Sequence, residues 1–109
     1  MDEAPCFRYI LKIRFDWDAG KAASNLRKHG IRFEDAMTAF DDPDALVAPD
    51  PAHSTAKESR EWLIGESDTV VLVVVFTVRQ PGDVHRLISA RPASRQERKR
   101  YEEAKGIPF

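Results

Sequence analysis

Two stretches of apolar residues predict strands of different kinds. Over residues 7–15 every second residue is apolar, and three of the four residues between them are basic. Side chains alternate across a strand, so this pattern predicts one half-buried strand with a basic outer face. Residues 70–76 are apolar throughout, which is typical of a central strand covered on both faces.

Helical periodicity follows the first predicted strand. Asp18 can cap a helix over residues 19–29, and Gly30 is suited to end it. The expected buried positions of this helix are Ala22, Ala23 and Leu26. A second helix is predicted directly afterwards and ends before Pro43. Its apolar residues recur at the spacing of one helix face, and they are Phe33, Ala36, Met37 and Phe40.

The second half of the chain predicts strands joined by short turns, followed by a helix. Besides the apolar run, strands are expected over residues 45–48, 61–65 and 84–91. Turn-forming residues lie between the last three strands. Ser94 and Glu97 fit a capping box at the start of the final helix. The expected fold class is therefore α+β, with an antiparallel sheet packed by two N-terminal helices and a C-terminal helix.

Length and composition indicate the number of domains and the cellular location of the protein. The chain of 109 residues suits one hydrophobic core, so a single domain over residues 1–109 is expected, with residues 1–6 as a flexible tail. No apolar run reaches the roughly 18 residues that cross a bilayer, and the acidic start does not resemble a secretory signal. Cys6 is the single cysteine. These features favour a cytoplasmic protein without membrane contact.

The net charge of −1 conceals an uneven distribution. Residues 32–69 hold three basic and ten acidic side chains, whereas residues 70–109 hold eight basic and four acidic ones. A local face that attracts phosphate is compatible with this pattern, and so is ordinary solvated charge.

Common cofactor sites are missing from the sequence. It has no phosphate-binding glycine loop and no cysteine pair for zinc, and its three histidines are scattered. No metal or other cofactor is expected, which leaves chemistry by charged side chains.

The predicted strand over residues 84–91 carries two arginines in different surroundings. Strict alternation places His85, Ser89 and Arg91 on one face, and Arg86 on the other face among apolar residues. Arg86 therefore lies near a sheet edge, pairs with a carboxylate or marks a bulge. Arg91 ends the strand just before a basic helix, where a guanidinium can hold a phosphate with two hydrogen bonds.

An acidic loop supplies a second group of candidates, His53, Glu58 and Arg60. An imidazole titrates near neutrality and can transfer a proton, and guanidinium groups can stabilise the charge of a phosphorane. Such groups can cleave RNA without a metal. A solvated loop with an incidental ion pair is the competing interpretation.

Other candidates have equally plain structural interpretations. Lys28 and His29 end the first helix, where positive charge favours the helix dipole and where RNA contact is the alternative. Trp17 and Trp62 suit packing in the core or at an edge, and either could also stack on a base.

The ordered set of these features resembles the BrnT toxins of bacterial type II toxin–antitoxin pairs. The matching segments are residues 15–18, 21–33, 33–36, 40–43, 50–54, 64–65, 86–91, 97–98 and 101–103. The resemblance implies a compact RelE-like ribonuclease fold and metal-independent cleavage of RNA, which inhibits translation. It also implies a BrnA-like ribbon-helix-helix antitoxin that neutralises the toxin, with operator DNA bound only through the complex.

The chemistry of the residues and the resemblance, read position by position, together give two groups of expected site residues. The expected catalytic residues are Arg60, Arg91, His53 and Glu58. The expected RNA-binding residues are Lys28, His29, Arg86 and Tyr101.

Two other functions stay open on the sequence alone. The adjacent helices over residues 18–40 are similar to a helix-turn-helix, so a non-catalytic DNA-binding or co-repressor module is one alternative. Against it, the second helix starts with acidic residues and lacks the Arg, Asn and Gln that read bases. The other alternative is an inactive toxin homologue that only binds its partner.

Overall fold

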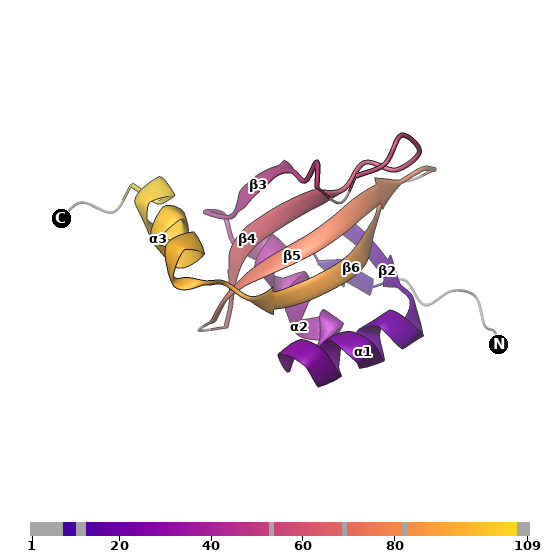
Figure 1. Cartoon of the computed structure of the whole chain (residues 1–109), viewed down its shortest axis with the longest axis horizontal. Coiled ribbons are helices and arrows are strands. Elements are labelled where there is room, and N and C mark those ends of the chain that lie inside the picture. Colours follow the sequence, from indigo (N-terminus) through magenta and orange to yellow (C-terminus); the bar gives the residue numbers. More distant parts are fainter. Residues whose placement is uncertain (1–7, 11–12, 53, 69, 82, 107–109) are drawn as a thin grey trace.

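Strands and helices build one layered arrangement in the part of the chain that the structure describes, which is residues 8–10, 13–52, 54–68, 70–81 and 83–106. There the computed structural model has six strands, three α-helices and one 3-10 helix (Figure 1). In chain order the elements are β1 (Arg8–Ile10), β2 (Ile13–Trp17), α1 (Ala19–His29), α2 (Phe33–Thr38), the 3-10 helix η1 (Ala39–Asp41), β3 (Leu46–Pro49), β4 (Glu61–Ser67), β5 (Val70–Arg79), β6 (Val84–Pro92) and α3 (Arg95–Ala104). The predicted tail over residues 1–6 lies outside this part. No helix within it is long and apolar enough to span a bilayer.

The strands form one sheet in the order β1-β2-β6-β5-β4-β3. The successive strands β4, β5 and β6 pair antiparallel, as do β3 with β4 and β1 with β2. Only one pair within the described sheet, β2 with β6, is parallel. The predicted α+β class and the antiparallel meander are confirmed. The sequence did not indicate the parallel pair, because β2 and β6 are far apart along the chain and local patterns do not report such pairing.

The strand predicted over residues 7–15 is wrong in its extent. The structure has two strands instead, Arg8–Ile10 and Ile13–Trp17, which pair antiparallel. Alternation holds within β2, where Phe15 is buried and its neighbours on the same face, Ile13 and Trp17, pack against the same core. Alternation shows which residues share a face, but it does not show where the chain reverses, and so the hairpin was missed.

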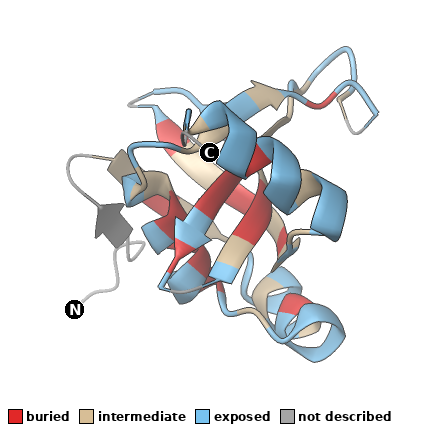
Figure 2. Cartoon of the chain, turned by 90° about the vertical axis from the view of Figure 1, so that its left-hand side faces the viewer, coloured by how far each residue is buried: buried red, intermediate tan, exposed pale blue. Residues whose placement is uncertain are grey.

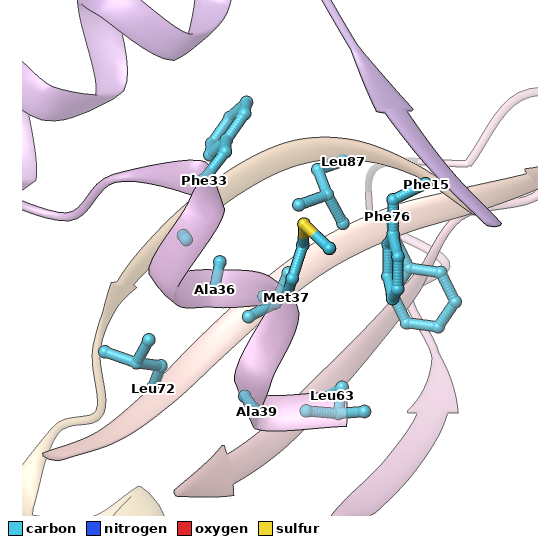
Figure 3. Close-up of a cluster of buried hydrophobic side chains, with 11 residues drawn as sticks. Phe15, Phe33, Ala36, Met37, Ala39, Leu63, Leu72, Phe76 and Leu87 are labelled. Atoms are coloured by element: carbon cyan, nitrogen blue, oxygen red, sulfur yellow. The ribbon is translucent and has the colours of Figure 1, made fainter. Parts of the chain in front are cut away.

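The main hydrophobic core lies on one face of the sheet, called here the helix face. From α2, the buried residues Phe33, Ala36 and Met37 point toward the strands (Figure 3). They belong to one cluster with the strand residues Phe15, Leu63, Leu72, Val74, Phe76, Leu87 and Ala90. The predicted apolar spacing of the second helix is thus confirmed, although α2 ends at Thr38 and Phe40 lies in η1.

The opposite face of the sheet packs against α3 at one end. Ile64 and Val73 form a second buried cluster with Tyr101 of α3. Their chain neighbours Leu63 and Val74 belong to the helix-face core, as alternation along β4 and β5 requires. Figure 1 shows α3 at one end of the sheet, and Figure 2 shows that its outer surface is exposed. We call this second side of the sheet the α3 face.

α1 begins and ends as the sequence predicts. The Asp18 side chain accepts a hydrogen bond from the Lys21 amide at 2.9 Å and so caps the first turn. Gly30 has a φ of 71° and follows the last helical residue, a left-handed conformation that glycine adopts without strain. These two local signals set the length of the helix.

α1 contacts the rest of the fold through Ala22, which packs against the core, and through the buried Asn25, so the predicted set of buried positions is wrong in part. Of the predicted buried positions, Ala22 is partly buried, whereas Ala23 is exposed and Leu26 is 47% exposed. Asn25 is the buried residue of α1. Its side chain donates to the Ala90 carbonyl at 2.7 Å and accepts from the Ala90 amide at 3.0 Å. The helix therefore docks on the backbone of β6 through hydrogen bonds rather than through leucine packing.

Candidate functional site

A β-bulge in β6 interrupts the alternation of its side chains. Val75 of β5 pairs with Ser89, whereas the next residue, Phe76, pairs with Leu87. Ile88 is therefore one extra residue on β6. Such an insertion shifts every later side chain to the face opposite to the one that strict alternation predicts.

The bulge corrects the predicted faces of β6. His85 and Leu87 lie on the helix face, where His85 stacks on Phe76 with ring centroids 5.4 Å apart. After the bulge, Ala90 takes the helix face, which leaves Arg91 on the α3 face. The predicted grouping of His85 with Arg91 is therefore wrong, since the extra residue lies between them.

A pocket of about 530 Å³ lies on the α3 face. Its floor consists of two cross-strand rows, one formed by Trp62, Val75 and Ser89 and the other by Ile64, Val73 and Arg91. The remaining lining residues are His29, Asp50, Arg60, Ile88, Glu97 and Arg100. The pocket therefore has an apolar floor and a charged rim.

Arg91 is held in place by a carboxylate of α3. Its Nη1 lies 2.7 Å from Oε1 of Glu97, and its Nη2 lies 2.8 Å from Oε2. Glu97 also accepts from the Ser94 amide at 2.8 Å, while Ser94 accepts from the Glu97 amide, so the predicted capping box is confirmed. The hydrogen bonds from Arg91 above all lower the pKa of Glu97 to about 2, and the same ion pair raises the pKa of Arg91. Both groups are charged at neutral pH.

Arg60 is oriented by Glu58 in a similar way. Its Nε donates to Glu58 Oε1 at 3.0 Å, and Arg79 donates to the other oxygen at 3.1 Å. The hydrogen bond from Arg60, followed by that from Arg79, lowers the pKa of Glu58. Glu58 borders a separate hollow beside Arg79 and does not line the pocket. Of these two residues, only Arg60 lines the pocket.

Hydrogen bonds join the two ends of the loop before β4. The Asp50 amide donates to the Arg60 carbonyl at 2.8 Å, and the Ser54 hydroxyl bonds both the Asp50 carbonyl and the Arg60 amide at 2.8 Å. These bonds place Arg60 beside Asp50 at the rim of the pocket. His53, the third candidate from this loop, lies outside the described residues.

The end of α1 reaches the pocket because Asn25 fixes that helix to β6. His29 is the last residue of α1 and lines the pocket. Lys28 lies in an adjoining hollow that also contains His29, Ile88 and Ser89. The two candidates from this helix end are thus placed differently: one borders the pocket and the other lies next to it.

Arg86 forms an ion pair away from the pocket lining. Its Nη1 lies 3.3 Å from Oδ2 of Asp16 on the neighbouring strand β2. Of the three situations expected for Arg86, the carboxylate pair is therefore found, and a bulge lies close by at Ile88. A sheet edge is excluded, since β6 pairs with strands on both sides.

Tyr101 faces the sheet rather than the pocket. It is 2% exposed, and its hydroxyl donates a hydrogen bond to the Asp42 carboxylate. Burial and then this bond raise the pKa of Tyr101 above its ordinary value. Although partial burial alone would raise the pKa of Asp42, hydrogen bonds from Tyr101 and from backbone amides lower it. This contact attaches α3 to the loop before β3.

The structure unites three of the eight site residues predicted from the sequence. His29, Arg60 and Arg91 line the pocket, whereas Lys28, Glu58, Arg86 and Tyr101 do not. The polar and charged pocket residues that the sequence did not single out as site residues are Asp50, Ser89, Glu97 and Arg100. The sequence did give signals for Glu97, which belongs to the capping box, and for Arg100, which lies on the basic helix. Neither signal showed that the side chain points toward the pocket.

The arrangement is suited to a ligand that joins an anionic group to a flat apolar one. Arginines from the loop before β4, from β6 and from α3 line the pocket, and guanidinium groups bind phosphate through paired hydrogen bonds. The floor supplies apolar surface, which has no such attraction for phosphate. A nucleotide has both groups, since its phosphate suits the arginines of the rim and its base suits the apolar floor.

Comparison with protein families gives a match over most of the chain. Residues 17–97 match the model described as the ribonuclease toxin, BrnT, of type II toxin-antitoxin systems. A comparison with curated proteins gives no match. The matched range includes α1, the whole pocket floor and Glu97, and it ends before Arg100 and Tyr101.

Proposed function

The chain belongs to the BrnT ribonuclease toxins of type II toxin–antitoxin systems, and from this premise we propose that it cleaves RNA in the pocket on the α3 face. A toxin of this class has RNA as its target and an antitoxin as its partner.

The convergence of Arg60, Arg91 and Arg100 carries this proposal. Arg60 is the last residue of the loop before β4, Arg91 lies in β6 and Arg100 in α3, yet all three line one pocket. The chain as a whole has a net charge of −1, so this grouping is not a result of a basic composition. Clustered guanidinium groups are suited to the negative charge that develops on a phosphorane.

We propose a metal-independent reaction, in which the arginines take the electrostatic role. A base removes the proton of a ribose 2′-hydroxyl, and the resulting oxygen attacks the adjacent phosphorus. The bond from phosphorus to the 5′-oxygen breaks, and an acid protonates that oxygen. The products are a 2′,3′-cyclic phosphate and a 5′-hydroxyl end.

Histidines are the proposed proton-transfer groups. His29 lines the pocket, and His53 belongs to the loop that ends at Arg60. Glu58 is ionised and paired with two arginines, so we assign it the orientation of Arg60 rather than proton transfer. Lys28 and Arg86 are proposed to attract more distant phosphates of the RNA.

We propose a RelE-like fold in a single domain, a cytoplasmic location, and neutralisation by a BrnA-like ribbon-helix-helix antitoxin. Operator DNA is then bound through the antitoxin in the complex. α2 has six residues and exposes the acidic Glu34 and Asp35, which does not favour direct binding of DNA by this chain.

Cleavage of RNA in the presence of a chelator tests the proposed function. The purified protein is expected to cleave single-stranded RNA in excess EDTA, and Arg91→Ala is expected to reduce the rate by about 100-fold or more. Arg98→Ala is the matched control, because Arg98 lies on α3 outside the pocket lining.

The outcomes separate the competing functions. Equal cleavage by wild type and Arg91→Ala would remove Arg91 from the site. Absence of cleavage, together with normal growth when the protein is expressed without an antitoxin, would support the inactive homologue.

A further inference from the structure

The apolar floor of the pocket, where Trp62, Val75 and Ile88 are partly exposed, is not explained by phosphate binding. Resting on the proposed function, we infer that this floor is a subsite for one unpaired nucleobase of the RNA, which stacks on Trp62. The substrate is therefore RNA with an unpaired nucleotide near the scissile bond.

The register of three strands builds this floor. Trp62 lies opposite Val75, which lies opposite Ser89. In the next row Ile64 lies opposite Val73, which lies opposite Arg91. One row is therefore headed by an aromatic ring and the next one ends in a guanidinium group, on the same face of the sheet.

Burial distinguishes the two rows. Ile64 and Val73 are 3% and 5% exposed and pack with Tyr101 beneath α3. Trp62, Val75 and the bulge residue Ile88 are only partly buried, although they occupy the inner strands of the sheet. The packing of Trp62 against the second core cluster holds the residue in place, while its partial exposure leaves it accessible to a ligand.

The arginines around the floor indicate the chemistry of the ligand that binds there. Arg60 and Arg91 border the same pocket as Trp62, so the occupant combines a flat apolar group with an anion. A pocket of about 530 Å³ lies within the range of small-ligand sites. An unpaired nucleotide fits this description, since its base has a π-face and its phosphate is anionic. A base within a duplex is stacked and does not present that face.

Fluorescence of Trp62 gives a test that does not depend on cleavage. The chain has two tryptophans, so Trp17→Phe leaves Trp62 as the sole tryptophan, whose emission is excited selectively over that of tyrosine. This variant is titrated with a single-stranded 2′-O-methyl RNA oligonucleotide, which cannot react at the 2′-position. Stacking is expected to quench the emission, and an abasic oligonucleotide of equal length, or the duplex, is expected to bind roughly 5- to 100-fold more weakly.

Cleavage by Trp62 variants provides the second arm. Trp62→Leu is expected to lower kcat/KM on the intact oligonucleotide by roughly 5- to 100-fold. Removal of the base that is proposed to stack on Trp62, by an abasic nucleotide at that position, should not lower kcat/KM further in Trp62→Leu. Both changes remove the same contact. Trp62→Phe keeps an aromatic face and should restore most of the activity. Trp17→Leu, on the helix face, is the matched control for general destabilisation, and thermal unfolding is followed for all variants.

The two proposals fail in different ways. Cleavage by the wild type, combined with unchanged Trp62 emission or with additive effects of Trp62→Leu and the abasic nucleotide, overturns the base subsite and leaves the ribonuclease assignment. Quenching by the intact oligonucleotide without any cleavage overturns the ribonuclease assignment and leaves the base subsite. Absence of both overturns both.

Discussion

Arg91 and Glu97 form a two-point ion pair across the junction of β6 and α3, with nitrogen–oxygen distances of 2.7 and 2.8 Å. The same Glu97 carboxylate accepts from the Ser94 amide and so completes the cap of α3. One side chain therefore both starts the helix and orients an arginine of the pocket. Loss of Glu97 is expected to affect stability and catalysis together.

The pH dependence of stability should report this ion pair. The pKa of Glu97 is about 2 in the folded protein against 4.5 for the ordinary group. A depressed pKa stabilises the folded state above pH 4.5, and this stabilisation is lost as the pH falls toward 2. Arg91 is 43% exposed in its side chain, so screening limits the expected contribution to roughly 1–2 kcal/mol.

Urea unfolding between pH 7 and pH 3 measures this contribution. Glu97→Gln retains a capping side chain but should have a flatter pH profile than the wild type and a lower free energy of unfolding at pH 7. Glu102→Gln, exposed on the same helix, is the control. Parallel profiles for the wild type and Glu97→Gln would show that the pair contributes little.

Arg100 should contribute to RNA binding although it follows the family match. Arg100→Ala is expected to lower kcat/KM by about tenfold or more, because it removes one cation from the pocket rim. It should also reduce the slope of log affinity against log salt by roughly 0.7, the value for one phosphate contact on a single strand. Lys99→Ala removes a neighbouring charge outside the pocket lining. Equal effects of the two substitutions would indicate nonspecific attraction by α3.

Asn25 should be one of the most sensitive positions for stability. Asn25→Leu leaves the Ala90 amide and carbonyl without their hydrogen bonds from this side chain, at an expected cost of roughly 2–4 kcal/mol. Ser24→Ala, the preceding residue on α1, should change stability by less than about 0.5 kcal/mol. Chemical denaturation compares the variants. A small effect for Asn25→Leu would mean that water or a rearranged helix replaces the lost bonds.

Tyr101 distinguishes a structural role from the RNA contact expected from the sequence. Tyr101→Phe removes the hydroxyl that donates to Asp42 and should cost roughly 1–2 kcal/mol, as for a hydrogen bond to a charged group. The KM for RNA should stay unchanged, because Tyr101 does not line the pocket. A raised KM with little loss of stability would instead support RNA contact. Ultraviolet titration should also find one tyrosine that ionises above the ordinary range, and this signal should vanish in Tyr101→Phe.

The elements with strong local signals were predictable from the sequence. Asp18 and Gly30 mark the ends of α1, Ser94 marks the start of α3, and residues 70–76 lie in a central strand. Each signal depends on residues close together along the chain. The reversal between β1 and β2 and the parallel pair of β2 with β6 were missed, because both depend on hydrogen bonds between strands.

Three side chains of the candidate site were named from the sequence, but the position of the site was not. Arg60, Arg91 and His29 were identified from their chemistry and from the resemblance to a family, and they line one pocket. The face of Arg91 was placed wrongly relative to His85, because one extra residue, Ile88, changes the parity of β6. Trp62 was recognised as able to stack on a base, but only the register set it in the same pocket as the arginines.

By itself, the sequence determined the family, the α+β class, the helix ends and the identity of the basic groups, because motifs and periodicity along the chain carry these signals. Only the tertiary structure decided which of those groups meet. The pairing of β4, β5 and β6 sets the rows of the pocket floor, and the bulge turns Arg91 toward it. Asn25 brings the end of α1 to the rim. These contacts join residues that are far apart in sequence. Local periodicity reports only neighbouring residues, so it does not show which distant residues gain free energy by meeting.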